Sequence, residues 1–84
     1  MTAAVRVIAL KAVWEMLMKC AIGYNRRATK HYWRVTYEGK TYATLPLGEH
    51  GRRTNPQIEA GHIRKMLRHL GIEECARSQL PDCF

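Results

Sequence analysis

Residues 59–72 read EAGHIRKMLRHLGI, and this stretch decides the fold. Its apolar side chains recur at intervals of three and four residues, which is the spacing of the buried face of an α-helix. That face holds Ile63, Met66, Leu67 and Leu70, and the positions expected to face solvent hold His62, Lys65, Arg68 and His69. Gly71 suits the left-handed conformation that ends many helices, so Ile72 should fold back toward Leu67. The stretch predicts an amphipathic helix with a buried face and a basic face.

The residues before this stretch predict where its helix begins. Asn55 followed by Pro56 is typical of an N-cap and a first helical position. The helix should therefore begin at Pro56 and bury Ile58 on the same apolar face. Residues 47–54 read as a loop by composition, and Pro46 is expected to end the strand before it.

Residues 3–22 predict a second amphipathic helix, ending near Gly23. Lys11, Glu15 and Lys19 repeat every fourth residue and form two opposite-charge pairs along one exposed stripe. The rest of the circumference is apolar and is expected to be buried, with Trp14 and the methionines in the core. A face this wide also leaves open a role in binding a partner. Because charges interrupt the run, a membrane-spanning helix is not expected.

Between the helices the sequence predicts a β-hairpin. Residues 31–37 and 40–45 are rich in aromatic and β-branched side chains, and Glu38-Gly39 separates them. A two-residue loop would pair Val35 with Tyr42. A three-residue loop with Gly39 in the left-handed position would pair Val35 with Thr41, and we favour it because it gathers more apolar residues on one face. That face would hold Trp33, Val35, Ala43 and Leu45.

The opposite face of this hairpin would be aromatic and basic. It would show Tyr32, Arg34, Lys40, Tyr42 and Thr44, a combination suited to stacking on RNA bases and contacting phosphates. An ordinary solvated sheet face is the alternative. Residues 24–30 before the hairpin are either a short edge strand or a basic loop.

These elements predict an α+β fold of the order α-β-β-β-α, with two helices packed on one face of a small antiparallel sheet. The length of 84 residues allows one domain, which we place at residues 1–76. Residues 77–84 show no clear period and are expected to form a loose tail. The sequence suggests no internal repeat.

Positive charge is concentrated in one part of the chain. From Arg26 to Arg68 there are ten Lys and Arg against three Glu, a net charge of +7, and the remaining residues are balanced. A concentrated positive field attracts polyanions. Nucleic acid is the first candidate partner and an acidic protein the second, whereas the plain alternative is a basic face that only keeps the domain in solution.

The cysteines indicate a reducing, cytoplasmic setting. Cys20, Cys75 and Cys83 are odd in number and lack CxxC spacing, so neither a disulfide framework nor a zinc site is expected. Cys20, among apolar neighbours, should lie in the core. No metal and no cofactor is predicted.

Several motifs resemble those of HicA-type toxins. Gly23-Tyr24 is similar to the Gly-aromatic pair that follows the family's first helix, and His31 opens a strand as the family's Gly-Ser-His motif does. Leu45-Pro46 stands where the family has Val-Pro, and residues 61–72 resemble its closing helix. Residues 28–30 here are Ala-Thr-Lys in place of Gly-Ser, and no histidine directly follows Pro46. The resemblance covers about residues 5–74.

The resemblance implies a fold like that of double-stranded-RNA-binding domains and a metal-independent endoribonuclease that cleaves mRNA. His31 would be its catalytic general base or acid, with Lys30 or Arg34 stabilising the charged transition state. His50, His62 and His69 are weaker candidates. The family also implies a neutralising partner, an acidic HicB-type antitoxin.

Charge and pattern together nominate the residues that would bind RNA. These are Arg26, Arg27, Lys30, Tyr32, Arg34, Tyr42, Arg52, Arg53, Lys65 and Arg68.

Two other functions stay open. One is a non-catalytic module of the same fold, a phage or mobile-element protein that binds nucleic acid or inhibits a host nucleoprotein complex. The other is a protein-binding module that uses the apolar face of the first helix, whose main interaction should be insensitive to salt.

Overall fold

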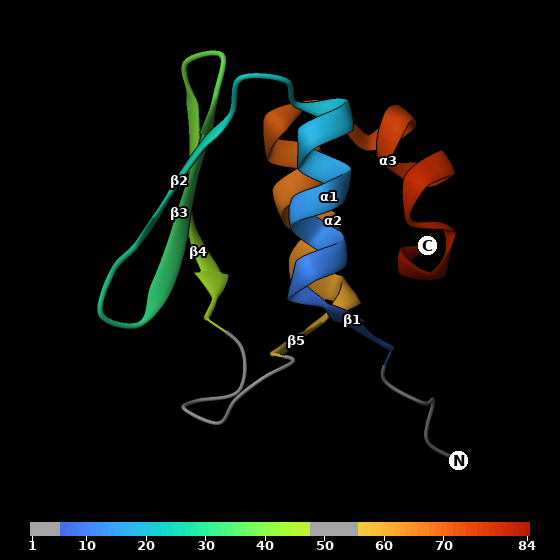
Figure 1. The fold of residues 1–84 in the computed structure, drawn as a ribbon, viewed down its shortest axis with the longest axis horizontal. Helices are drawn as coiled ribbons and strands as arrows, with labels where there is room; N and C mark the ends of the chain where they lie inside the picture. Colours follow the sequence, from blue (N-terminus) through green and yellow to red (C-terminus); the bar gives the residue numbers. More distant parts are fainter. Residues whose placement is uncertain (1–5, 48–55) are drawn as a thin grey trace.

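The structure is a computed structural model that describes residues 6–47 and 56–84. Its α+β architecture has a three-stranded sheet, a layer formed by two helices and a C-terminal helical segment on the far side of those helices (Figure 1). In chain order the elements are β1 (Val7–Ala9), α1 (Leu10–Cys20), β2 (Asn25–Ala28), β3 (Tyr32–Tyr37), β4 (Lys40–Pro46), β5 (Gln57–Glu59), α2 (Ala60–Leu70), α3 (Glu73–Gln79) and the 3-10 turn η1 (Pro81–Cys83). The fold class agrees with the prediction.

A short strand precedes each main helix. β1 and β5 pair antiparallel, with Ile8 opposite Ile58, and both isoleucines are buried. The predicted helix start at Pro56 is therefore wrong, and the first helix begins only at Leu10. The backbone N–H of Leu10 donates to Pro56 O at 2.9 Å, and that of Ala60 donates to Arg6 O at 2.9 Å. Each helix thus begins with a hydrogen bond to the other unit, which takes the place of a side-chain cap.

The two strand-helix units repeat each other. Each has a three-residue strand and an eleven-residue helix, and residue Ile8 of the first corresponds to Ile58 of the second. At the same spacing the buried Met16 and Leu17 correspond to Met66 and Leu67. This likeness of fold was not expected, because the sequence suggested no internal repeat. The solvent-facing positions differ between the two units, so the repeat lies in the buried residues alone.

The β-hairpin is present, but its turn has two residues. Tyr37 pairs with Lys40, and Glu38 and Gly39 both have positive φ, of 48° and 80°. Such turns match the twist of the strands they join. The three-residue loop that we favoured from the sequence is wrong.

A β-bulge reconciles this turn with the core. Val35 lies opposite Tyr42, whereas Trp33 lies opposite Leu45, so Ala43 and Thr44 together face the single residue Arg34. The extra residue returns Leu45 to the helix-facing side beside Trp33, and both Val35 and Leu45 are fully buried. Ala43, expected in the core, is exposed.

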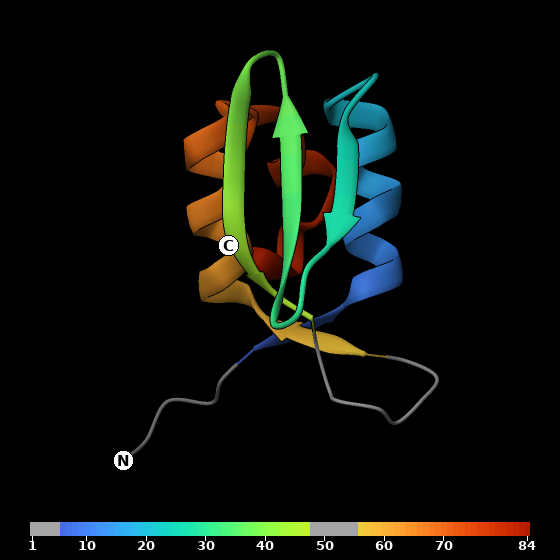
Figure 2. The same ribbon diagram turned by 90° about the vertical axis from the view of Figure 1, so that its left-hand side faces the viewer.

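Residues 25–28 form a true edge strand, which settles the choice between a strand and a basic loop. The sheet order is β2-β3-β4. In Figure 2 the sheet lies in front, with α1 behind β2 and α2 behind β4.

The core lies between this sheet and the helix pair. Its fully buried large side chains include Val13, Met16, Leu17, Val35, Leu45, Ile58, Ile63, Met66, Leu67 and Leu70. The end of α2 is as predicted, since Gly71 has φ 74° and the N–H of Ile72 donates to Leu67 O at 3.0 Å. The apolar circumference of α1 is not buried throughout, because Met18 is 66% exposed and Ile22, just after the helix, is 78% exposed.

The C-terminal residues are ordered by contacts, contrary to the expected loose tail. α3 and η1 pack on the side of the helices away from the sheet (Figure 1). A disulfide joins Cys20, the last residue of α1, to Cys75 in α3, with a Cα–Cα distance of 5.6 Å. Arg64 Nη1 donates to the carbonyl of Cys83 at 2.7 Å, and the Cys83 side chain is buried. The expectation of no disulfide is therefore wrong, because it could not include the packing of α3 against α1. Cys20 is half-buried and packs against the core.

No helix in the described part of the chain has the length and apolar character needed to cross a membrane.

Candidate nucleic-acid interface

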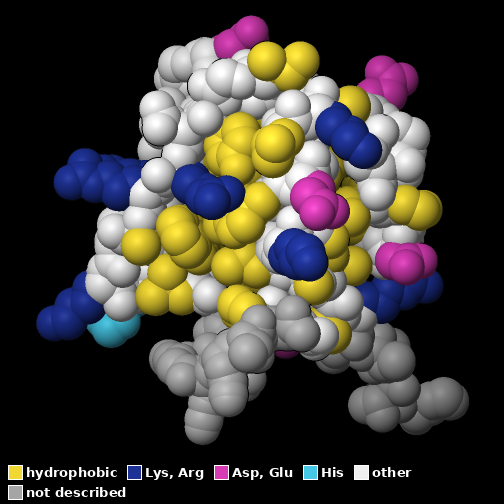
Figure 3. All heavy atoms as spheres, viewed as in Figure 1, with side chains coloured by type: hydrophobic (Ala, Val, Ile, Leu, Met, Phe, Trp, Pro, Cys, Tyr) yellow, Lys and Arg dark blue, Asp and Glu magenta, His cyan; other side chains and the backbone are white. Residues whose placement is uncertain are grey.

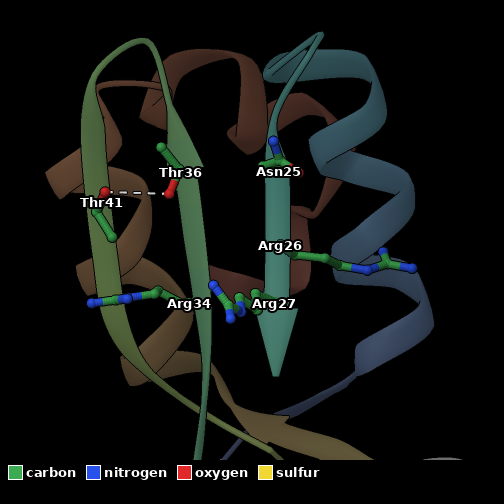
Figure 4. Close-up of a pocket in the computed structure, with 6 residues that line it drawn as sticks. All are labelled: Asn25, Arg26, Arg27, Arg34, Thr36 and Thr41. Carbon is green, nitrogen blue, oxygen red and sulfur yellow. Dashed lines mark hydrogen bonds between the residues drawn. The ribbon is translucent and has the colours of Figure 1, made fainter. Parts of the chain in front are cut away.

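The outer face of the sheet, away from the helices, is polar and basic. Side chains alternate along a strand and directly opposed residues share a face, so the outward positions follow from the register. They are Asn25 and Arg27 on β2, Tyr32, Arg34 and Thr36 on β3, and Thr41 on β4. Five of the six line a surface hollow together with Arg26, and Figure 4 shows Arg27 and Arg34 at its lower end, with the Arg34 side chain pointing across β4.

Arg27 and Arg34 are directly opposite each other on neighbouring strands, and both are exposed. Like charges in this position cost roughly 0.2–1 kcal/mol. Within residues 6–47 and 56–84 the recorded ion pair is that of Arg68 with Glu73, and no carboxylate neutralises the two arginines. Guanidinium groups bind phosphate oxygens through two parallel hydrogen bonds. A phosphate bound to either arginine would match positive charge that no described carboxylate neutralises.

Neutral polar groups complete this hollow. Thr36 and Thr41 lie opposite each other and their hydroxyls share a hydrogen bond of 3.2 Å, while Asn25 lies opposite Thr36 on the other side. Sequence reasoning missed these three residues, because only the strand register places them beside the arginines.

His31 lies in the turn between β2 and β3, at one end of this face. Thr29 holds the turn, since its hydroxyl bonds to both the carbonyl and the N–H of Tyr32, at 2.9 and 3.2 Å. Lys30 and His31 are exposed, and the His31 ring stands edge-on to Tyr32 with centroids 6.4 Å apart. No hydrogen bond of the His31 side chain occurs within the described part of the chain. The histidine is open to a ligand, and no described residue orients it through a hydrogen bond.

Arg26 differs from Arg27, its neighbour in sequence. It lies opposite the buried Val35, so it points to the helix side of the sheet, as Figure 4 also shows. Its guanidinium stacks on the Trp14 ring at 4.3 Å, lies 5.8 Å from the Trp33 ring, and donates to Tyr24 Oη at 2.9 Å.

We call Trp14, Tyr24 and Trp33 the aromatic cluster. The two tryptophan rings meet edge to face at 5.0 Å, and Tyr24 stacks against Trp14 at 6.4 Å. Arg26 is therefore part of the junction between α1 and the sheet.

Tyr42 is not on the outer face. It pairs with the buried Val35, is half-buried, and its ring lies 5.8 Å from that of His69 on α2. Lys40 also faces the helix side, with its Nζ near Gly71. The predicted placement of Lys40 and Tyr42 on the outer face was wrong for one reason. A turn shorter by one residue moves the β4 side chains between the turn and the bulge to the opposite face of the sheet.

The basic residues of α2 form a separate surface. Lys65 and Arg68 are exposed and line a second hollow with Glu59, Gly61, His62 and Arg64. Arg68 Nε is 3.8 Å from Glu73, so part of its charge is already matched. Arg52, Arg53 and His50 lie outside the described residues.

Within residues 6–47 and 56–84 there is no group of three or more His, Cys, Asp or Glu side chains that could hold a metal ion. Comparison of the chain with family models, with curated proteins and with solved structures found no match.

Proposed function

We propose that this protein is an RNA-binding toxin of the HicA type, which holds mRNA on the outer face of the sheet and cleaves it without a metal. The observation that carries the proposal is the pair Arg27 and Arg34, opposed on adjacent strands without a described carboxylate. The resemblance of residues 61–72 to the closing helix of HicA toxins supports the choice of RNA among polyanions.

RNA would contact this face through its backbone and one base. Arg27 and Arg34 would bind phosphate oxygens, and Lys30 at the turn would add a further positive charge. Tyr32 is 43% exposed at the same end and offers a ring on which an unpaired base can stack. A single strand is therefore the form of RNA that fits best.

The chemistry would be transfer of the phosphate to the neighbouring ribose oxygen. His31 would take the proton of the 2′-hydroxyl, the 2′-oxygen would form a bond to phosphorus, and the bond from phosphorus to the 5′-oxygen would break. The leaving oxygen would take a proton from water. The products are a 2′,3′-cyclic phosphate and a 5′-hydroxyl, and Lys30 or Arg34 would stabilise the additional negative charge of the transition state.

The protein would act in the cytoplasm, where mRNA is translated, and an acidic HicB-type antitoxin would silence it by covering the basic face. In a reducing cytoplasm Cys20 and Cys75 would be thiols, so the disulfide would form only on oxidation.

Induced expression in bacteria tests the proposal. Wild-type protein should arrest growth and leave mRNA fragments with cyclic phosphate ends, while His31→Ala should do neither. His69→Ala is the matched control, because His69 is also an exposed histidine and should remain toxic. An inert wild type, or a toxic His31→Ala, would contradict the catalytic role.

One observation favours the second candidate, a non-catalytic module of the same fold that binds nucleic acid or inhibits a host nucleoprotein complex. Catalytic bases are usually oriented by a hydrogen bond to a third group, and the described residues give His31 none. Such a module would bind RNA with steep salt dependence, and Arg34→Glu would abolish binding, yet purified protein would leave the RNA intact.

A further inference from the structure

We propose that the free edge of β2, together with the exposed apolar side chains at the end of α1, docks an extended acidic segment of a partner protein as a fourth strand. This site lies beside the outer face of the sheet and shares Arg27 with it. It does not depend on RNA binding or cleavage.

Among the described residues, no strand pairs with the outer edge of β2. It is the first strand in the order β2-β3-β4, and all four of its residues are exposed. Its ladder partner is β3, and the other recorded backbone bonds nearby, from Tyr24 N to Ala21 O and from Thr29 N to Tyr32 O, lie outside the strand. An edge of this kind offers main-chain donors and acceptors to another extended chain.

The two edges of the sheet differ in how they are covered. β4 at the opposite edge lies over α2, with Tyr42 against His69 (Figure 2). β2 is linked to α1 through the side chain of Arg26, which reaches back to Trp14, and no other described segment bonds to the outer edge of its main chain. β2 is therefore the edge at which a further strand would be added.

Exposed hydrophobic side chains lie next to this edge. Met18 is one helical turn after Trp14, and Ile22 follows the end of α1, with exposures of 66% and 78%. Because Arg26 of β2 stacks on Trp14, the aromatic cluster connects the side of α1 that carries Met18 to β2. Figure 3 shows hydrophobic side chains gathered over this side of α1 and toward the sheet, with only a few charged side chains among them. Large apolar groups left so exposed are typical of a surface that binds a protein.

Charge identifies the occupant. The edge carries Arg26 and Arg27, with Lys30 in the following turn. α1 adds two positive charges, Lys11 and Lys19, and one negative charge, Glu15. A second copy paired through β2 would bring these arginines close to their own counterparts, which is unfavourable. An RNA strand could match the charge but not the main-chain hydrogen bonds of a strand edge. A polypeptide with alternating acidic and apolar residues matches the charge, the edge and the exposed Met18 and Ile22.

A synthetic peptide tests this in solution. The probe is an acetylated, amidated heptapeptide of alternating Glu and Val, and its control replaces the central Val by Pro, which disrupts strand pairing. With the full-length chain labelled for NMR, the first peptide should shift the amide signals of residues 25–28 and protect some of them from exchange. The proline peptide should bind at least about tenfold more weakly.

Matched variants locate the apolar part of the site. Met18→Glu with Ile22→Glu changes two exposed positions and should weaken peptide binding about tenfold. Val7→Glu introduces one negative charge, where the double variant introduces two, at another exposed apolar position, 48% exposed on β1, and should leave affinity unchanged. The proposal is overturned if the peptide shifts Arg34, Thr36 and Thr41 on β3 and β4 in place of residues 25–28, if the proline peptide binds equally well, or if the free protein dimerises through β2. A failure of RNA cleavage leaves these outcomes unaffected.

Discussion

Breaking the disulfide between Cys20 and Cys75 should lower stability greatly. The bond closes a loop across a sequence separation of 55 residues. In the chain-entropy account, a loop of that size raises the free energy of unfolding by about 4 kcal/mol, because it restricts the unfolded chain. In a domain of 84 residues this corresponds to a fall in the melting temperature of roughly 20 °C.

The assay is thermal unfolding followed by far-UV circular dichroism, with and without reductant. The oxidised wild type should melt well above both the reduced wild type and Cys75→Ser, and reductant should not change the melting of Cys75→Ser further. A thiol titration in denaturant provides the control, since the oxidised chain should expose only the thiol of Cys83. Oxidised and reduced proteins that melt within about 2 °C of each other would refute the reasoning, as would a titration that finds three thiols.

Three further predictions concern single residues. Arg34→Glu should raise the free energy of unfolding by up to about 1 kcal/mol, because it turns a repulsive pair with Arg27 into an attractive one, and should abolish RNA binding; a variant that melts lower and still binds contradicts this. Gly71→Ala should lower the free energy of unfolding by about 1 kcal/mol, measured by urea unfolding, because φ is 74° at this position. Gly61→Ala should not lower the free energy of unfolding, because Gly61 has an ordinary helical conformation. Burial raises the pKa of the Cys83 thiol above its ordinary 9.0, against a smaller opposing effect of Arg64, so the free energy of unfolding should fall as pH rises above about 9. As pH rises, the unfolded chain loses the Cys83 proton before the folded chain does. Cys83→Ala should therefore lose less stability than the wild type above this pH. Parallel pH profiles of the two proteins would contradict a contribution from Cys83.

The sequence predicted the features that depend on local pattern. The stripe of Ile63, Met66, Leu67 and Leu70 is buried as its spacing indicated, and Gly71 ends α2 as a residue free to adopt positive φ should. Local pattern cannot show which distant segments meet. Pro56 indicated the first turn of a helix, yet the pairing of β1 with β5 makes the next three residues a strand. Cys20 and Cys75 meet only because α3 packs against α1.

The candidate site was predicted only in part, because the length of the turn at Glu38-Gly39 determines which face of the sheet each β4 side chain occupies. Arg27 and Arg34 followed from charge, but their direct opposition depends on β2 being a strand in this register. Tyr42 was placed on the wrong face because a loop of two residues and a loop of three were both compatible with Glu38-Gly39. The bulge at Ala43 and Thr44 then restored Leu45 to the core, which is why the apolar pattern alone favoured the wrong turn.

The pairing of β1 with β5 also bears on the order in which the chain assembles during synthesis. α1 is synthesised early, but the N–H of Leu10, its first residue, donates to Pro56 O, and β1 pairs with β5, where Ile8 lies opposite Ile58. Until residues 57–59 leave the ribosome, the apolar side chains of α1 have only part of their core to pack against. Contacts this distant in sequence form late. Arg27 and Arg34 are therefore synthesised well before the scaffold that supports them is complete, so a nascent chain does not yet present a finished basic face.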